Sequence, residues 1–179
     1  MRIIAGQWRG RALALPLQDV TRPTTDRVRE ALFSMLHSRI GDFSGKRMLD
    51  AFAGSGAFGL EALSRGAAHV VFAESNKKTR TVLQQNIEQF KCNDSILIYH
   101  DAFDLPATKI PSDVIFLDPP YKKGFESQIV PMLMNWGYIG AETLIIVESD
   151  ASSVPISLSV LCCESVRTYG SCAISFWAI

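Results

Sequence analysis

The chain has 179 residues, of which 47% are hydrophobic and 20% are charged, and it includes 12 glycines and 8 prolines. These values are typical of one compact globular domain and exclude a collagen-like, coiled-coil or disordered chain. No apolar run approaches the ~20 residues that cross a bilayer, and the N-terminus becomes polar at once. We therefore expect a cytoplasmic protein with no signal peptide and no membrane segment.

The formal charge is zero, but it is unevenly distributed along the chain. Residues 1–47 carry nine Lys or Arg against four acids, a net charge of +5, and the remainder carries −5. Most of these basic residues are arginines and Trp8 lies among them, which suits phosphate contacts and base stacking. A solvated surface explains the same charge equally well.

Four cysteines are present, at positions 92, 162, 163 and 172. They form no Cys-x-x-Cys pair, and neighbours in an extended strand point to opposite faces, which suits neither zinc nor a disulfide framework. We expect buried free thiols and no bound metal.

The N-terminal part of the chain is expected to form a small extension. Extended segments at residues 2–5 and 11–15 are separated by Gly6 and Gly10, which predicts a hairpin. A loop over residues 19–25 follows. The spacing of Val28, Leu32 and Leu36 then predicts a helix from Asp26 to about residue 39.

From residue 46 onward, short apolar runs alternate with helical patterns. Strands are expected at residues 48–52, 69–74, 96–100, 114–117 and 143–148, with helices at 57–65, 77–90 and 126–136. This order predicts an α/β fold with a doubly wound, mostly parallel, seven-stranded Rossmann-like sheet that binds ligands at its carboxyl edge. The last runs, 158–166 and 173–178, are joined through Tyr169-Gly170 and must form an antiparallel hairpin at the sheet edge. We divide the chain into a basic extension, residues 1–45, and a ligand-binding domain, residues 46–179.

A glycine-rich loop, Asp50-Ala51-Phe52-Ala53-Gly54-Ser55-Gly56, follows the first strand of this series. Such a loop accommodates a nucleotide pyrophosphate or the amino-acid end of S-adenosylmethionine equally well. Asp50 favours the second ligand, because a carboxylate repels a pyrophosphate and attracts an ammonium group. Glu74 is placed for ribose hydroxyls under both interpretations, and Asp101 either accepts from an adenine amine or caps a helix at residues 102–105.

The string Asp118-Pro119-Pro120-Tyr121 follows an apolar strand at the edge where a ligand should lie. Two prolines remove two backbone donors, so the turn offers a carboxylate and carbonyl groups as acceptors only. An exocyclic amine suits this turn, because it can donate hydrogen bonds to Asp118 and to the Pro119 carbonyl while Tyr121 stacks on the base. At an ordinary Asp pKa of about 3.9, Asp118 would be a poor base, so we expect proton loss to follow methyl transfer.

These two motifs together resemble the Rossmann-type amino-methyltransferases. The start MRIIAGQWRGR and the strings RPTTDRVREALF and LEALSRGA are similar to those of the bacterial 16S ribosomal RNA guanine-N2 methyltransferases. The likeness extends roughly over residues 1–148. It implies S-adenosylmethionine-dependent methylation of one guanine N2 in 16S ribosomal RNA, within the small ribosomal subunit or its assembly intermediate.

The resemblance also implies roles for individual residues. Catalysis would fall to Asp118, Pro119 and Tyr121, and the cofactor would be held by Asp50, Phe52, Gly54, Gly56, Glu74, Asp101 and Thr24. The RNA would be held by Arg9, Arg11, Arg22, Arg27 and Lys122. The family usually has an acid where this chain has Asn76, which makes a second ribose contact there neutral.

Other functions fit part of the sequence. The same acceptor turn suits adenine N6 or a protein amide, because each is a planar NH₂ group beside a π system. Gly54, Gly56, Gly59 and Glu74 fit an NAD-dependent oxidoreductase, but no hydride-transfer residues are evident. A non-catalytic RNA-binding module would explain the basic N-terminal part but not the Asp118 turn.

Overall fold

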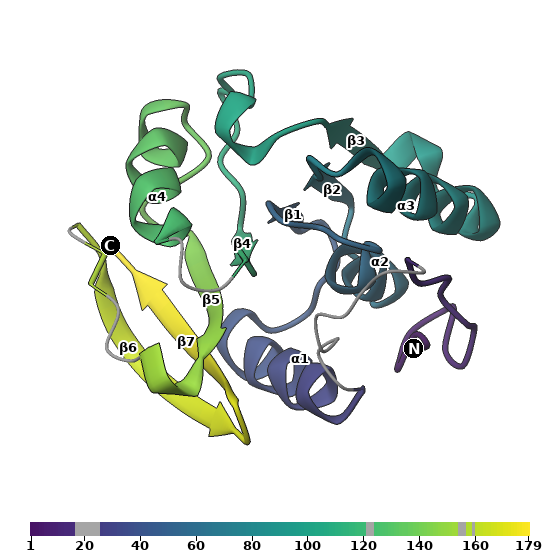
Figure 1. Cartoon of the computed structure of the whole chain (residues 1–179), viewed down its shortest axis with the longest axis horizontal. Coiled ribbons are helices and arrows are strands. Elements are labelled where there is room, and N and C mark those ends of the chain that lie inside the picture. Colours follow the sequence, from purple (N-terminus) through teal and green to yellow (C-terminus); the bar gives the residue numbers. More distant parts are fainter. Residues whose placement is uncertain (17–25, 121–123, 154–156, 159) are drawn as a thin grey trace.

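The computed structural model describes residues 1–16, 26–120, 124–153, 157–158 and 160–179 (Figure 1). Its helices are α1 (Asp26–Ile40), α2 (Ala57–Ser64), α3 (Lys77–Phe90) and α4 (Phe125–Asn135). Its strands are β1 (Arg47–Asp50), β2 (His69–Ala73), β3 (Ile96–Tyr99), β4 (Val114–Leu117), β5 (Leu144–Asp150), β6 (Cys162–Tyr169) and β7 (Cys172–Ala178). Short 3₁₀ turns are η1 (Asn93–Ser95), η2 (Ala102–Asp104) and η3 (Ala151–Ser153).

The strands form one seven-stranded sheet in the order β3-β2-β1-β4-β5-β7-β6. Neighbours among β1 to β5 are parallel, whereas β7 runs antiparallel between β5 and β6. This confirms the predicted α/β fold and its antiparallel C-terminal hairpin. The strand order reverses between β1 and β4, and ligands bind beside such a switch point in open α/β sheets.

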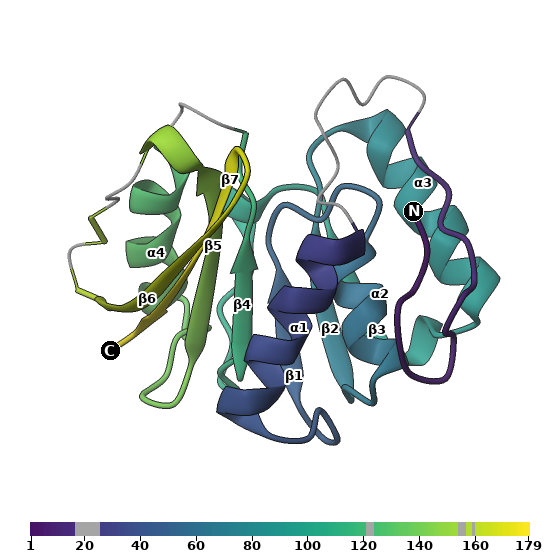
Figure 2. The ribbon, with the colours of Figure 1, turned by 90° about the horizontal axis from the view of Figure 1, so that it is seen from below.

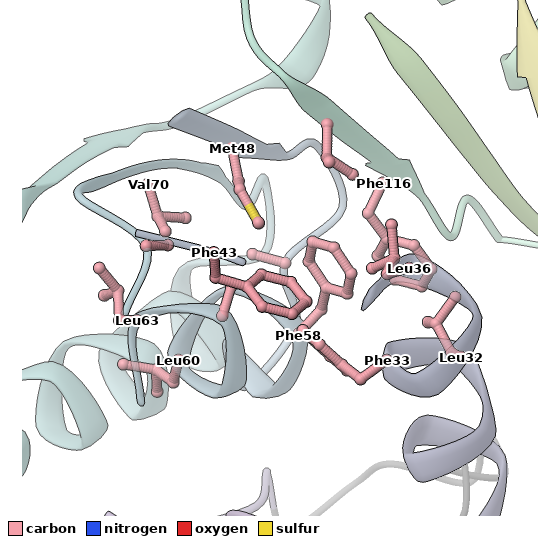
Figure 3. Close-up of a cluster of buried hydrophobic side chains, with 14 of the residues drawn as sticks. Leu32, Phe33, Leu36, Phe43, Met48, Phe58, Leu60, Leu63, Val70 and Phe116 are labelled. Atoms are coloured by element: carbon pink, nitrogen blue, oxygen red, sulfur yellow. The ribbon is translucent and has the colours of Figure 1, made fainter. Parts of the chain in front are cut away.

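Helices cover both faces of the sheet (Figure 2). On one face, side chains of α1, α2 and α3 pack with Met48, Phe72 and Phe116 in a single apolar cluster. Figure 3 shows Phe58 of α2 at its centre, and the rings of Phe58 and Phe116 stack with centroids 4.3 Å apart. On the other face, α4 packs against residues of β1, β4 and β5.

The N-terminal residues form the predicted turn, although only as a minimal hairpin. One antiparallel bridge joins Arg2 to Ala12, and the amides of Ile4 and Ala5 donate to the Glu61 carboxylate at 2.7 and 3.0 Å. The Glu61 side chain is fully buried in α2. The segment is therefore held against α2 through a buried carboxylate.

The expectations for the cysteines and for the start of the last hairpin need correction. Cys162 and Cys163 are exposed because they lie in the edge strand β6, and Cys92 and Cys172 are only half-buried. The prediction of buried thiols is therefore wrong, although all four thiols are free. The last hairpin begins at Cys162 rather than at residue 158. Among the described residues, no helix is long and apolar enough to span a membrane. The expected loop at residues 19–25 lies outside the described residues.

Candidate active site

A cavity of about 610 Å³ opens at the carboxyl edge of the sheet, above β1, β2, β4 and β5. It brings together most of the residues that the sequence singled out for the cofactor and for chemistry. Its lining includes Asp50, Phe52, Gly54, Glu74, Asp101, Asp118 and Pro119. The volume falls in the range of ~300–1,000 Å³ that is usual for small-molecule sites.

The two glycines of the loop have different surroundings. Gly54 has a φ of 55°, its amide donates to Glu74 Oε2 at 2.9 Å, and a Cβ added to it would meet no atom within 4 Å. Gly56 has a φ of 83°, but a Cβ there would lie 2.4 Å from Leu83 Cδ1. Gly54 therefore keeps the loop open toward the cavity, while Gly56 allows α3 to pack closely.

Glu74 and Asn76 shape the neighbouring wall. The second oxygen of Glu74 accepts a hydrogen bond from the backbone N–H of Asn76 at 2.7 Å, so one carboxylate joins the glycine loop to the turn after β2. The Asn76 side chain accepts from Lys78 and Thr79 and caps α3. The neutral residue at position 76 thus has a structural role besides lining the cavity.

Asp101 and Phe52 complete this end of the cavity. Asp101 Oδ1 accepts the Phe103 amide at 3.0 Å and caps η2, which confirms the capping interpretation. The Phe52 ring lies parallel to Phe125, with centroids 6.4 Å apart, and edge-on to Phe103. The cavity therefore has an aromatic side chain fixed beside its glycine loop.

Asp50 lies at the bottom of the cavity and is almost fully buried. Its Oδ2 accepts the Gly59 amide of α2 at 3.1 Å. Burial raises the pKa of Asp50 to about 7; the charge of Glu74 also raises it, and the Gly59 hydrogen bond opposes both. A cation that reaches Asp50 would favour its ionised form.

Asp118 is half-buried where β4 ends. Desolvation raises its pKa well above the ordinary Asp value, and the charges of Glu148 and Asp50 add to this shift. The expectation of an ordinary pKa for Asp118 is therefore wrong, because it took no account of desolvation or of the two further carboxyls nearby. In its ionised form, a carboxylate with a raised pKa is a stronger proton acceptor than a free Asp side chain.

The expected RNA contacts are only partly described. Arg9, Arg11 and Arg27 are all exposed, but Arg11 Nη2 also donates to the Gln89 carbonyl at 2.7 Å and its guanidinium stacks on Phe90. Trp8 is partly buried and packs on the same Phe90 ring, against the edge of the apolar core. The remaining predicted residues lie outside the described residues; they are Arg22, Thr24, Tyr121 and Lys122.

Sequence reasoning missed two charged residues of the cavity, Arg29 and Glu148. Arg29 is buried in α1, close to the carboxylates of Asp26 and Glu61. Within the described part of the chain, its Nε and Nη1 have no hydrogen-bond partner. A signal for Arg29 existed, because it lies three, four and seven positions before apolar residues of the buried helix face.

The comparisons with known proteins agree with this geometry. The model of the family "Conserved hypothetical protein 95" matches residues 1–178. The chain is 41% identical over 154 residues to Ribosomal RNA small subunit methyltransferase D of Escherichia coli K12, covering 86% of this chain and 76% of that protein. It is 38% identical over 155 residues to the protein of that name from Haemophilus influenzae, covering 84% and 79%.

The chain belongs to the family "Conserved hypothetical protein 95". The solved structure of the yhhF protein of Escherichia coli is also similar, with a TM-score of 0.84 and 35% identity over 99% of this chain and 97% of that one. These relatives are named as methyltransferases, which gives no support to the NAD interpretation.

Proposed function

We propose that this protein transfers a methyl group from S-adenosylmethionine to the exocyclic N2 amine of a guanine in 16S ribosomal RNA of the small subunit. The observation that carries the proposal is the single cavity that joins the glycine loop to the Asp118-Pro119-Pro120 turn. The names of its relatives, small-subunit ribosomal RNA methyltransferases, support the RNA substrate.

The cavity residues fit the proposed methyl donor. Asp50 is a buried carboxyl beside the glycine loop, and Arg29 brings a buried guanidinium to the same cavity. Together they match a group that carries both an ammonium and a carboxylate. Glu74 would accept hydrogen bonds from the ribose hydroxyls, and Asp101 and Phe52 would lie beside the adenine. Thr24 is a proposed cofactor contact from the N-terminal extension.

The chain's own residues would prepare the amine for attack. When bound, S-adenosylmethionine supplies an electrophilic methyl group on a positively charged sulfur. Asp118 and the Pro119 carbonyl accept from the two N2 protons and aim the nitrogen lone pair at that methyl group, so orientation lowers the barrier. Once the methyl group had passed from sulfur to nitrogen, Asp118 would accept the surplus proton from N2. Tyr121 would stack on the base.

The test uses small ribosomal subunits purified from a strain that lacks this gene. We expect the purified protein with labelled S-adenosylmethionine to produce N2-methylguanosine, measured by mass spectrometry of digested 16S ribosomal RNA. The Asp118→Ala variant should lose turnover by at least about 100-fold while still binding the methyl donor, because a positioned acceptor contributes ~10²–10⁴-fold. Asp104→Ala, an exposed carboxylate in η2, is the matched control.

The result would contradict the proposal if naked duplex DNA were methylated while these subunits stayed unmodified. Formation of N6-methyladenosine in the subunits would contradict the guanine assignment and leave the methyltransferase assignment standing.

A further inference from the structure

Three carboxyl side chains of the cavity lie on consecutive strands of the sheet. Asp50 ends β1, Asp118 directly follows β4, and Glu148 lies in β5. Leu117 pairs with Val147, so Asp118 and Glu148 are the next neighbours across this parallel pair. Adjacent strands are ~4.8 Å apart, which places the two carboxyls side by side.

Glu148 lies on the far side of Asp118 from the proposed cofactor residues. Glu74 and Asp101 follow β2 and β3, on one side of β1, whereas Glu148 belongs to β5, beyond β4. The walls of the same cavity include Leu32, Phe58 and Phe116, three buried apolar side chains. A flat base would therefore meet apolar walls with two carboxyl groups at its edge, which act as acceptors in their ionised forms.

The Glu148 carboxyl accepts a hydrogen bond from the neighbouring strand β7. The Cys172 thiol of β7 donates to Glu148 Oε1 at 3.3 Å. Burial raises the pKa of this thiol, and the charge of Glu148 adds to the shift, so Cys172 stays a protonated donor. Although five carboxyl residues line the cavity, no group of three His, Cys, Asp or Glu among the described residues could hold a metal ion.

Two neighbouring acceptors distinguish guanine from adenine. The Watson–Crick edge of guanine presents N2–H and N1–H side by side, both donors. Adenine presents the N6 amine beside N1, which is an acceptor and would face a carboxylate lone pair. An enzyme that reads a base outside the helix does so through this edge.

We propose that Glu148 accepts the N1–H of the target guanine while Asp118 holds the N2 amine, so that Glu148 selects guanine over adenine. This inference rests on the proposed function, and it explains the choice between guanine and adenine, which the Asp118 turn alone leaves open. Glu148 acts as a specificity-determining residue, and Cys172 positions it.

The experiment compares two substrates that differ at one base. Wild-type protein first locates the methylated guanine in small subunits from the strain without this gene, and a second set of subunits carries adenine at that position. Glu148→Gln should lower kcat/KM on guanine by about tenfold or more, the effect of losing one good base contact. The Gln amide can donate to adenine N1, so the guanine-to-adenine preference should fall by at least about tenfold.

The controls separate recognition from folding. Glu142→Gln makes the same chemical change at an exposed position before β5 and should retain both the rate and the preference. Calorimetry should show unchanged affinity of Glu148→Gln for S-adenosylmethionine. Glu148→Asp keeps the carboxylate, so its rate on guanine should fall while the preference for guanine is retained, which tests the inference even if the Gln variant does not fold.

An unchanged guanine-to-adenine preference in Glu148→Gln would overturn the inference, whether or not the rate fell, and so would a loss of that preference in Glu148→Asp. Failure of the proposed function is a separate result, because wild-type protein would then form no N2-methylguanosine on the first set of subunits.

Discussion

Asp50 shows how burial at a single residue makes ligand binding depend on pH. Its pKa of about 7 means that the carboxyl is mainly protonated at pH 6 and mainly ionised at pH 7.5. An ammonium group binds the ionised form, so affinity for S-adenosylmethionine should rise with pH and level off above 7. Simple titration predicts about an eightfold increase between pH 6 and 7.5, measured by calorimetry. Higher pH is avoided because α-amino groups lose their proton near ~7.7–8.0.

Asp118 also has a raised pKa, so the Asp50→Asn variant is needed to assign this pH dependence. Asparagine still offers an oxygen to the Gly59 amide but cannot titrate. This variant should bind the methyl donor more weakly, with an affinity that no longer changes between pH 6 and 7.5. If Asp50→Asn kept the wild-type pH dependence, the titrating group would be Asp118 and the assigned role of Asp50 would be wrong.

Individual residues differ in how far the sequence reveals their place. Asp50 and Asp118 follow recognisable strands and adjoin glycine or proline strings, so their place at one edge of the sheet was predictable. Glu148 ends the strand expected at residues 143–148 but adjoins no motif, and in the structure β5 continues to Asp150. It becomes significant only because β5 pairs with β4, and strand order is not contained in local periodicity. The exposed position of Cys162 and Cys163 likewise depends on β6 being an edge strand.

The glycine loop and the helix after it form an element in which each glycine can be tested separately. A Cβ at Gly54 would point into open space, although its φ of 55° makes any side chain cost about 1 kcal/mol. A Cβ at Gly59 would lie 2.3 Å from the Phe72 ring and would force α2 away from β2. The two positions therefore serve different purposes, ligand access and helix packing.

Substituting alanine at each position should separate these purposes. Gly59→Ala should lower the free energy of urea unfolding by about 1–3 kcal/mol, the usual cost of overpacking a core. Gly54→Ala should lose about 1 kcal/mol at most, but its affinity for S-adenosylmethionine should fall by about tenfold or more. Gly54→Ala with wild-type affinity would show that the cofactor does not approach this loop.

Most elements were predictable because their apolar spacing is regular and glycines or polar residues mark their ends. The boundaries of α1, α2 and α3 agree with expectation to within about one residue. The N-terminal hairpin was expected to have two extended arms but has a single bridge. Its position depends on hydrogen bonds to Glu61 and Asn86, which lie at least 56 residues away in sequence.

At the scale of the whole molecule, the division of charge separates a basic N-terminal part from an acidic remainder. Figure 2 shows the N-terminal segment beside α3, on the opposite side of the molecule from β6. Arg9 and Arg27 are exposed in this basic part, whereas Arg11 also supports α3 through Gln89 and Phe90. Arg9 and Arg27 are therefore the described arginines with which to test RNA contact without disturbing the fold.

The double variant Arg9→Ala/Arg27→Ala should bind small subunits more weakly, and its affinity should depend less on salt. Each phosphate contact that is lost reduces the number of counterions released when the subunit binds. The slope of log K against log salt should therefore become shallower by about 1–2 units. Arg167→Ala, at an exposed position of the edge strand β6, is the control and should retain the wild-type slope. Adding Arg22→Ala to the double variant extends the test to another of the predicted RNA contacts. An unchanged slope in the double variant would show that these arginines are simply solvated, and RNA recognition would then rest on the cavity and its rim.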